Sequence, residues 1–156
     1  YGGEMVDKVS FEQTTFNKVP FKFGAGTANV GAALGLGTAV KFIQSLDRKA
    51  VEEYEEYLLN YATERLSKID GIRFIGQAPK RSGLISFLID NIHPYDLGTI
   101  VDKMGVALRT GHHCAEPVMT FFDIPGTVRA SFAIYNTTEE IDIFIKAVEK
   151  AANMLR

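Results

Sequence analysis

"VRASFAIYNTTEEIDIFIKAVEKAANML" (residues 128–155) decides the fold class, because a strand pattern comes directly before a helix pattern. Residues 128–135 are rich in β-branched and aromatic side chains, which favours a strand. Thr137 and Glu140 have the spacing of a capping box. An apolar stripe follows at helical spacing: Ile141, Phe144, Ile145, Val148 and Leu155. The stretch therefore predicts a strand and then a helix that buries one face.

The same change of period recurs upstream. Apolar residues at helical spacing predict helices over residues 28–46, 47–70 and 93–105, whereas shorter apolar runs predict strands over 72–76, 83–89 and 106–110. Residues 18–23 alternate around Pro20, which is typical of an edge strand. Glycines in the first helix suggest close packing against other backbone. We therefore expect an α+β (α/β) chain with a small sheet covered by helices.

The composition excludes several classes of protein. The 156 residues are enough for one domain with a real core. Lysine and arginine total 17 and the acidic residues 19, so no basic excess points to nucleic acid or to an anionic membrane. The uncharged run 23–40 contains too many polar residues and glycines for a membrane span. A single cysteine cannot form an internal disulfide, so we expect a reducing, cytoplasmic location.

That cysteine, Cys114, lies in "VALRTGHHCAEPV" (residues 106–118), directly after His112 and His113. A lone cysteine is most often a small buried side chain. The glycine, histidines and proline around this one instead indicate a turn-rich loop, where reactive groups tend to lie. Arg109, five positions upstream, and the two histidines could stabilise a thiolate. A sulfur carrier, a hydrolase nucleophile, a metal ligand and a buried filler are the candidate roles.

Two of these roles have weak support. A metal site needs three or four converging ligands, and the consecutive residues 112–114 seldom converge, so no metal is predicted. A cysteine hydrolase needs a histidine that folding holds beside the thiol. His93 is a distant candidate, although its surroundings are typical of a helix start.

Two further motifs indicate anion binding. Arg129 lies near the start of a predicted strand, among apolar residues. It is either an arginine at a strand end that extends toward solvent or an anchor for a small carboxylate, which arginine binds with two parallel hydrogen bonds. "GAGT" (residues 24–27) leads into a predicted helix, and such a helix start suits phosphate.

Together these stretches resemble one family. "RTGHHCAEP" resembles the cysteine motif of SufS-type (group II) cysteine desulfurases, related to selenocysteine lyases within the class-V aminotransferases. "GGEM", "FGAGTANVGAALGLGTAV", "HPYDLG" and "VRASFAIYNTTEEID" are similar to the same family in the same order, so that the resemblance covers essentially the whole chain. Ala28 stands where a proline is expected after the threonine, a minor departure.

The resemblance implies a fold-type-I enzyme that uses pyridoxal 5′-phosphate (PLP). Residues 1–30 would be a remnant of the large PLP-binding domain with its linker, and residues 31–156 the C-terminal small domain with a mostly antiparallel sheet. Cys114 would take sulfur from L-cysteine, giving L-alanine and a persulfide for iron–sulfur cluster assembly. Arg129, supported by Arg109, would bind the substrate carboxylate.

The resemblance also implies partners and leaves alternatives open. Gly26 and Thr27 would contact the cofactor phosphate of the other subunit in a homodimer, whereas His112 and His113 would tune the thiolate or protonate an intermediate. L-Selenocysteine is an alternative substrate, and a sulfur-acceptor protein is the expected partner, with no nucleic acid and no membrane. The alternative functions are those of a related PLP-dependent aminotransferase and of a non-enzymatic module with this fold.

The family's Schiff-base lysine lies upstream of the matching region, and no lysine of this chain has its context. We therefore expect the chain to be a C-terminal fragment that neither binds PLP nor turns over by itself.

Overall fold

The computed structural model describes residues 2–156, and its internal contacts divide the chain into two units after Asp47. The second unit is Arg48–Arg156. The boundary expected from the sequence lies after residue 30 and would place the helix of residues 30–45 in the second unit. The internal contacts instead place this helix in the first unit. Among the described residues, no helix combines the length and the apolar character that crossing a membrane requires.

The first unit contains a hairpin, a short turn of helix and one long helix. Strands β1 (Val6–Val9) and β2 (Thr14–Phe16) pair antiparallel. The 3-10 helix η1 (Phe21–Phe23) follows, so the edge strand predicted over residues 18–23 is wrong. The backbone there forms turn bonds instead, because Phe23 N donates to the Pro20 carbonyl and Gly24 N donates to the Phe21 carbonyl.

Helix α1 (Val30–Ser45) confirms the first predicted helix and begins with an Asn29 cap, whose side chain accepts from Ala32 N. None of its residues is buried. A Cβ added at Gly35 or Gly37 would meet no atom within 4 Å. The close backbone packing expected from its glycines is therefore absent within the described chain, and α1 exposes an apolar surface there.

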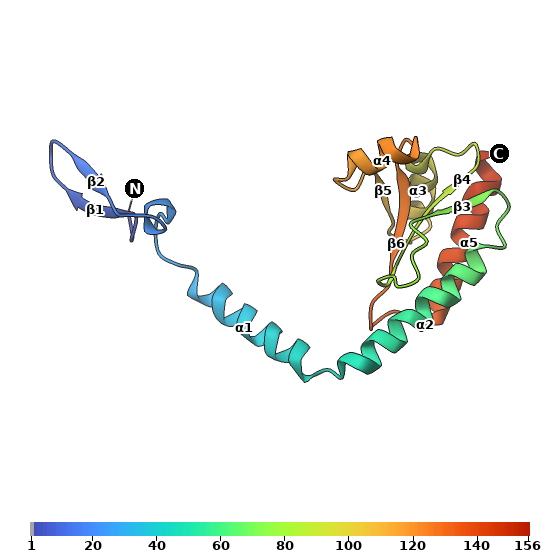
Figure 1. Ribbon diagram of the computed structural model, residues 1–156, viewed down its shortest axis with the longest axis horizontal. Coiled ribbons are helices and arrows are strands. Elements are labelled where there is room, and N and C mark those ends of the chain that lie inside the picture. Colours follow the sequence, from blue (N-terminus) through green and yellow to red (C-terminus); the bar gives the residue numbers. More distant parts are fainter. Residues whose placement is uncertain (1) are drawn as a thin grey trace. The chain divides into compact units, whose positions relative to one another are not determined.

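The second unit is built on a four-stranded antiparallel sheet with the strand order β3-β4-β6-β5 (Figure 1). The strands are β3 (Ile72–Ile75), β4 (Leu84–Ile89), β5 (Arg109–Gly111) and β6 (Thr127–Ser131). The predicted fold class, a small antiparallel sheet covered by helices, is confirmed. The strands at β5 and β6 are shorter than predicted, so residues 106–108 and 132–135 leave the ladder.

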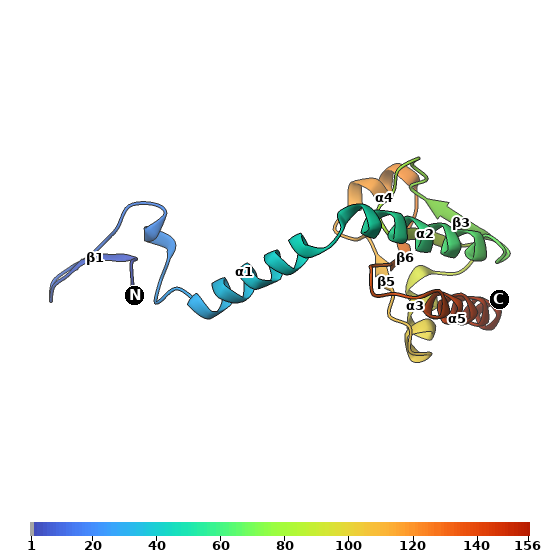
Figure 2. The same cartoon turned by 90° about the horizontal axis from the view of Figure 1, so that it is seen from below.

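Helices α2 (Arg48–Leu66), α3 (Pro94–Lys103) and α5 (Thr138–Leu155) cover one face of this sheet (Figures 1 and 2). The core between them is continuous and apolar, and its fully enclosed side chains include Phe87, Leu58, Leu97 and Val148. Helix α5 starts with the predicted capping box between Thr137 and Glu140. Its buried positions include four of the five residues in the predicted stripe, so the helical period was sufficient to find that face.

Helix α4 (Glu116–Phe122) lies against the other face of the sheet. A small second cluster of Leu88, Met119 and Ile124 fixes it there. Because successive residues of a strand point to opposite faces, the polar residues that alternate with the core of β4 and β6 lie on the α4 side. That side carries the candidate site.

Candidate functional site

The central feature of the α4 side is a pair of arginines. Arg109 on β5 is the direct register partner of Arg129 on β6, and Arg129 is also the register partner of Ser86 on β4. These three side chains therefore form a row across the sheet. Within residues 2–156 neither arginine forms a salt bridge with a carboxylate, and the buried Nε of Arg129 has no hydrogen-bond partner. The site thus holds two cations with unused donor capacity.

Thr127 lies two residues before Arg129 on β6 and is a buried polar residue of the second unit, with 1% of its surface exposed. Its hydroxyl is 2.9 Å from His113 Nε2 and 3.1 Å from the Ser86 hydroxyl. His113 Nε2 is also 3.2 Å from the Thr127 carbonyl. His113 is therefore anchored to β6 on the same face as the arginine pair.

The thiol follows in a strained turn. Ala115 N donates to the His112 carbonyl at 2.9 Å, and the two residues between them have positive φ angles, 56° at His113 and 57° at Cys114. Turns of this kind favour glycine or asparagine, and each non-glycine residue held in this region costs about 1–3 kcal/mol. Such strain tends to occur at functional sites. Cys114 is exposed within the described residues, which disfavours the buried-filler alternative.

His113 lies in the field of both arginines. Burial, followed by the positive charge of Arg129, holds the pKa of His113 below its ordinary value of 6.5, and Arg109 and His112 act in the same direction. The hydrogen bond to the Thr127 backbone opposes them. His113 Nδ1 is buried without a hydrogen-bond partner. The neutral imidazole is therefore favoured here, with one ring nitrogen unused.

The structure separates the two histidines that the sequence left equivalent. His112 is exposed and lines a shallow depression with α4, together with Glu116 and Asp123. His113 instead contacts β6. Among the described residues no three His, Cys, Asp or Glu side chains gather where they could hold a metal ion.

Gly26 and Thr27 belong to the first unit, and they line a hollow with Gly3, Glu4 and Ala28. Gly26 has φ 81°, and a Cβ there would meet no atom within 4 Å, so its outer side is open. Its N–H donates to the Gly2 carbonyl at 3.1 Å, and Gly3 forms a bridge with Gly26. A phosphate would therefore approach the open side of this loop and the Thr27 hydroxyl rather than the Gly26 amide.

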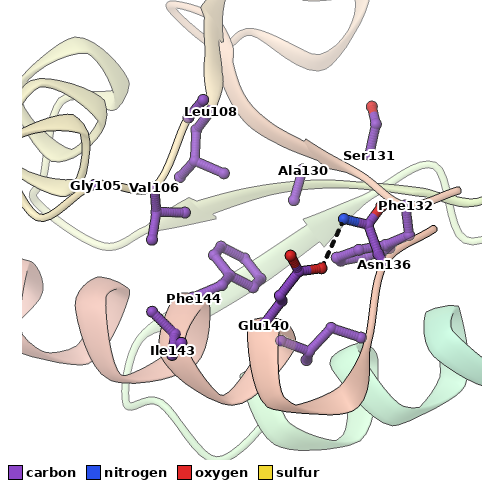
Figure 3. A pocket seen from close by; sticks show the side chains of 12 residues that line it. Gly105, Val106, Leu108, Ala130, Ser131, Phe132, Asn136, Glu140, Ile143 and Phe144 are labelled. Carbon is purple, nitrogen blue, oxygen red and sulfur yellow. Dashed lines mark hydrogen bonds between the residues drawn. The ribbon is translucent and has the colours of Figure 1, made fainter.

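A pocket of about 400 Å³ lies on the opposite side of β6 (Figure 3). Ala130, Phe132 and Phe144 line it, and Asn136 donates to Glu140 at its edge. Ala130 points to the core side of the strand, whereas Arg129 points to the α4 side. None of the residues predicted for the site lines this pocket, so it is separate from the arginine pair.

Sequence reasoning missed Thr127 and Ser86. Both leave a weak signal: Ser86 is a polar residue within the apolar run 84–89, and Thr127 precedes Arg129 by two residues, which places both on one strand face. Their pairing depends on the register between β4 and β6, which cannot be read from the sequence.

With this geometry established, the comparisons with known proteins define the class. The model of the family "Aminotransferase class-V" matches residues 1–144. The chain therefore belongs to the class-V aminotransferase family, whose members use PLP.

Its relatives within that family are cysteine desulfurases. A probable cysteine desulfurase of Vibrio cholerae serotype O1 is 48% identical over 154 residues, which are 99% of this chain and 38% of the relative. A cysteine desulfurase of Salmonella agona is 42% identical over 155 residues, 99% of this chain and 38% of that protein. The chain thus spans less than two fifths of the curated relatives that it matches.

Solved structures agree. The cysteine desulfurase CsdA of Escherichia coli superposes with a TM-score of 0.81 at 36% identity, covering 100% of this chain and 39% of that one. The apo cysteine desulfurase of Thermococcus onnurineus NA1 gives 0.80 at 35% identity, covering 99% and 39%. A C-DES mutant with glycine covalently linked to the PLP cofactor shares the fold at 16% identity and a TM-score of 0.66.

Proposed function

We propose that this chain is the C-terminal part of a PLP-dependent cysteine desulfurase in which Cys114 accepts sulfur from L-cysteine. One observation carries the proposal. Arg129 and Arg109 lie directly opposite each other on neighbouring strands, without a carboxylate partner among the described residues, on the face where His113 anchors the turn of Cys114. Two like charges at opposed positions destabilise a sheet, and a bound anion offsets that repulsion.

Arg129 binds the α-carboxylate of the substrate. Its planar guanidinium presents donors in a geometry that matches a carboxylate. Its buried Nε–H has no hydrogen-bond partner and is therefore available as a donor. Arg109 is exposed and contributes its charge from the neighbouring strand. The pair therefore favours a small anionic substrate and sets the position of its carboxylate.

The residues of the first unit fit the phosphate end of PLP. The open side of Gly26 and the hydroxyl of Thr27 line one hollow at a glycine-rich loop, which leaves room for a phosphate against the backbone. We place this contact across a homodimer, with the loop of one subunit at the cofactor of the other. PLP, when bound, supplies the electron sink for breaking the substrate's carbon–sulfur bond.

Cys114 acts as the nucleophile. Its thiolate attacks the sulfur of the bound amino acid, so that a new S–S bond forms while the carbon–sulfur bond breaks. The electron pair of the broken bond goes to the carbon, which takes up a proton and leaves as alanine. The sulfur remains on Cys114 as a persulfide. An acceptor thiol then attacks the outer sulfur. The exposure of Cys114 supports such a transfer, because a second protein must reach it. Delivery to iron–sulfur cluster assembly in the cytoplasm is the expected use.

The test uses a protein that joins this chain to the PLP-binding part with its lysine. Incubation with L-cysteine is expected to add the mass of one sulfur atom to the peptide that contains Cys114 and to release alanine in equal amount. Cys114→Ser is expected to lose the added sulfur while the cofactor's absorbance spectrum stays unchanged. A Cys114→Ser protein that carries sulfane sulfur at the full level would contradict the proposal.

The same assay separates the rival functions. An aminotransferase-like relative would consume the amino acid without depending on Cys114, and a non-enzymatic module would consume none. L-Selenocysteine in place of L-cysteine tests the alternative substrate, and a kcat/KM higher for selenocysteine would reassign the protein to selenium chemistry. A cysteine hydrolase would keep its activity after PLP is removed.

A further inference from the structure

Thr127 has a role that its burial alone does not explain. Its side chain is almost fully enclosed, and it forms one hydrogen bond toward His113 and one toward Ser86. A buried hydroxyl has one proton to donate and lone pairs to accept. The direction of each bond is therefore limited by the atoms around it.

The Thr127 carbonyl settles that direction. His113 Nε2 lies 3.2 Å from this carbonyl oxygen and 2.9 Å from the Thr127 hydroxyl oxygen. A carbonyl oxygen only accepts, so this contact is a hydrogen bond only when Nε2 carries the proton, which favours the Nε2–H tautomer. In that tautomer Nε2–H donates to both oxygens of one residue. The proton of the Thr127 hydroxyl then has the Ser86 hydroxyl oxygen, 3.1 Å away, as its acceptor. The hydrogen-bond chain runs from the histidine into the sheet.

We propose that Thr127 is a positioning residue that holds His113 as its Nε2–H tautomer and so keeps Nδ1, on the residue next to Cys114, as an unprotonated acceptor. Nδ1 is buried and has no partner within the described residues. Arg129 and Arg109 from the two neighbouring strands and His112 from the same loop all disfavour a proton on this ring. Thr127 thereby also holds the strained turn in which Cys114 lies.

The inference rests on the proposed function only in its last step. The site then offers a donor with no partner, Arg129 Nε, and an acceptor with no partner, His113 Nδ1. An amino acid substrate brings both counterparts, a carboxylate for the first and an N–H or S–H for the second. The wrong tautomer would present an N–H where the substrate also presents one, and the two would repel.

The tautomer is measurable on the 156-residue chain with ¹⁵N-labelled histidine, without cofactor or activity. Long-range ¹H–¹⁵N spectra above pH 7 are expected to show a protonated Nε2 and a bare Nδ1 at His113. His93 is an internal control, because its Nδ1 accepts from Tyr95 N and no bond links it to Thr127. Thr127→Val keeps the side-chain shape and removes the hydroxyl. The substitution leaves the carbonyl and removes the nearer of the two acceptors. It is therefore expected to increase the fraction of Nδ1–H tautomer at His113. It should also lower the titration midpoint, because an acceptor on Nε2–H stabilises the imidazolium, and Thr127→Ser should restore both.

A protonated Nδ1 in the wild-type chain overturns the proposal, and so does a Thr127→Val spectrum identical to wild type. If Thr127→Val does not fold, the wild-type spectrum still tests the tautomer. Ser86→Ala then serves as the second variant, because it removes the far end of the hydrogen-bond chain. An unchanged titration midpoint of His113 in Ser86→Ala would contradict the proposed bond from Thr127 to Ser86.

In the protein that includes the PLP-binding part, Thr127→Val is expected to lower kcat about twofold to tenfold with KM for cysteine unchanged, because a mixture still contains the correct tautomer. Equal loss in Thr127→Ser would reduce Thr127 to a packing residue. Absence of desulfurase activity in the wild-type protein would refute the proposed function and leave the tautomer measurement standing.

Discussion

Arg109 and Arg129 are direct partners in the β5–β6 ladder, so two guanidinium groups start from opposed positions on neighbouring strands of one small sheet. Selection for stability alone disfavours like charges at such positions. The pair also lies on the face opposite the main core, where α4 and the Cys114 turn lie. This arrangement supports the proposed role of the pair in binding an anionic ligand.

Removing one charge is expected to stabilise the chain. Arg109→Gln relieves the cross-strand repulsion and should raise the free energy of unfolding by about 0.2–1 kcal/mol in the absence of ligand. Urea denaturation at low ionic strength measures this, and high salt should shrink the difference. Arg73→Gln on the edge strand β3 is the matched control, since its register partner is Leu88. Equal effects of the two substitutions would contradict the repulsion.

Arg129 is expected to matter for binding rather than for folding. Arg129→Gln in the protein with its PLP-binding part should weaken cysteine binding by about 1.5–3 kcal/mol, the usual contribution of a hydrogen bond to a charged group. Steady-state kinetics would show this mainly as a higher KM. Arg129→Lys should recover only part of the affinity for cysteine, because an ammonium does not present the planar pair of donors. An unchanged KM and kcat in Arg129→Gln would remove the carboxylate role.

Stability is expected to fall on mild acidification because of His113. Its pKa is lowered in the folded chain, so the folded state holds the neutral ring better than the unfolded state does. The contribution is therefore fully present above the ordinary pKa of 6.5 and is lost as pH falls through the lower folded pKa. Urea midpoints measured at successive pH values below 6.5 test this. His113→Gln should flatten this pH profile, whereas His112→Gln, at an exposed position, should not. An unchanged profile in His113→Gln would contradict the proposed contribution of His113.

The start of α5 is expected to contribute through its capping box. Thr137→Ala removes the side chain that accepts from Glu140 N and should lower the free energy of unfolding by about 1 kcal/mol. Thr138→Ala, one position inside the helix, is the control and should cost less. Thermal unfolding followed by circular dichroism measures both, and similar losses at the two positions would show that the cap is not the cause.

Periodicity predicted the elements whose packing is local. The stripe of α5 and its capping box, the helix 93–105 and the strands around residues 72–89 all follow from side-chain spacing, because one buried face imposes its period on the sequence. The strand prediction for residues 18–23 was wrong for a local reason as well. Alternation around Pro20 suggested a strand, but the backbone there forms the hydrogen bonds of a turn. In α1 the glycines suggested close packing, and the described chain supplies no backbone against them.

The sequence by itself determined the chemical groups of the site: one thiol, two histidines before it, and two arginines. It also determined that they lie on loops and strand ends, because glycine, proline and polar residues interrupt the apolar periods around them. Only the tertiary structure decided that Arg109 opposes Arg129, that His113 rather than His112 reaches β6, and that Thr127 and Ser86 belong to the site. Strand register and loop direction made those choices, because they depend on contacts between residues that are far apart in the chain.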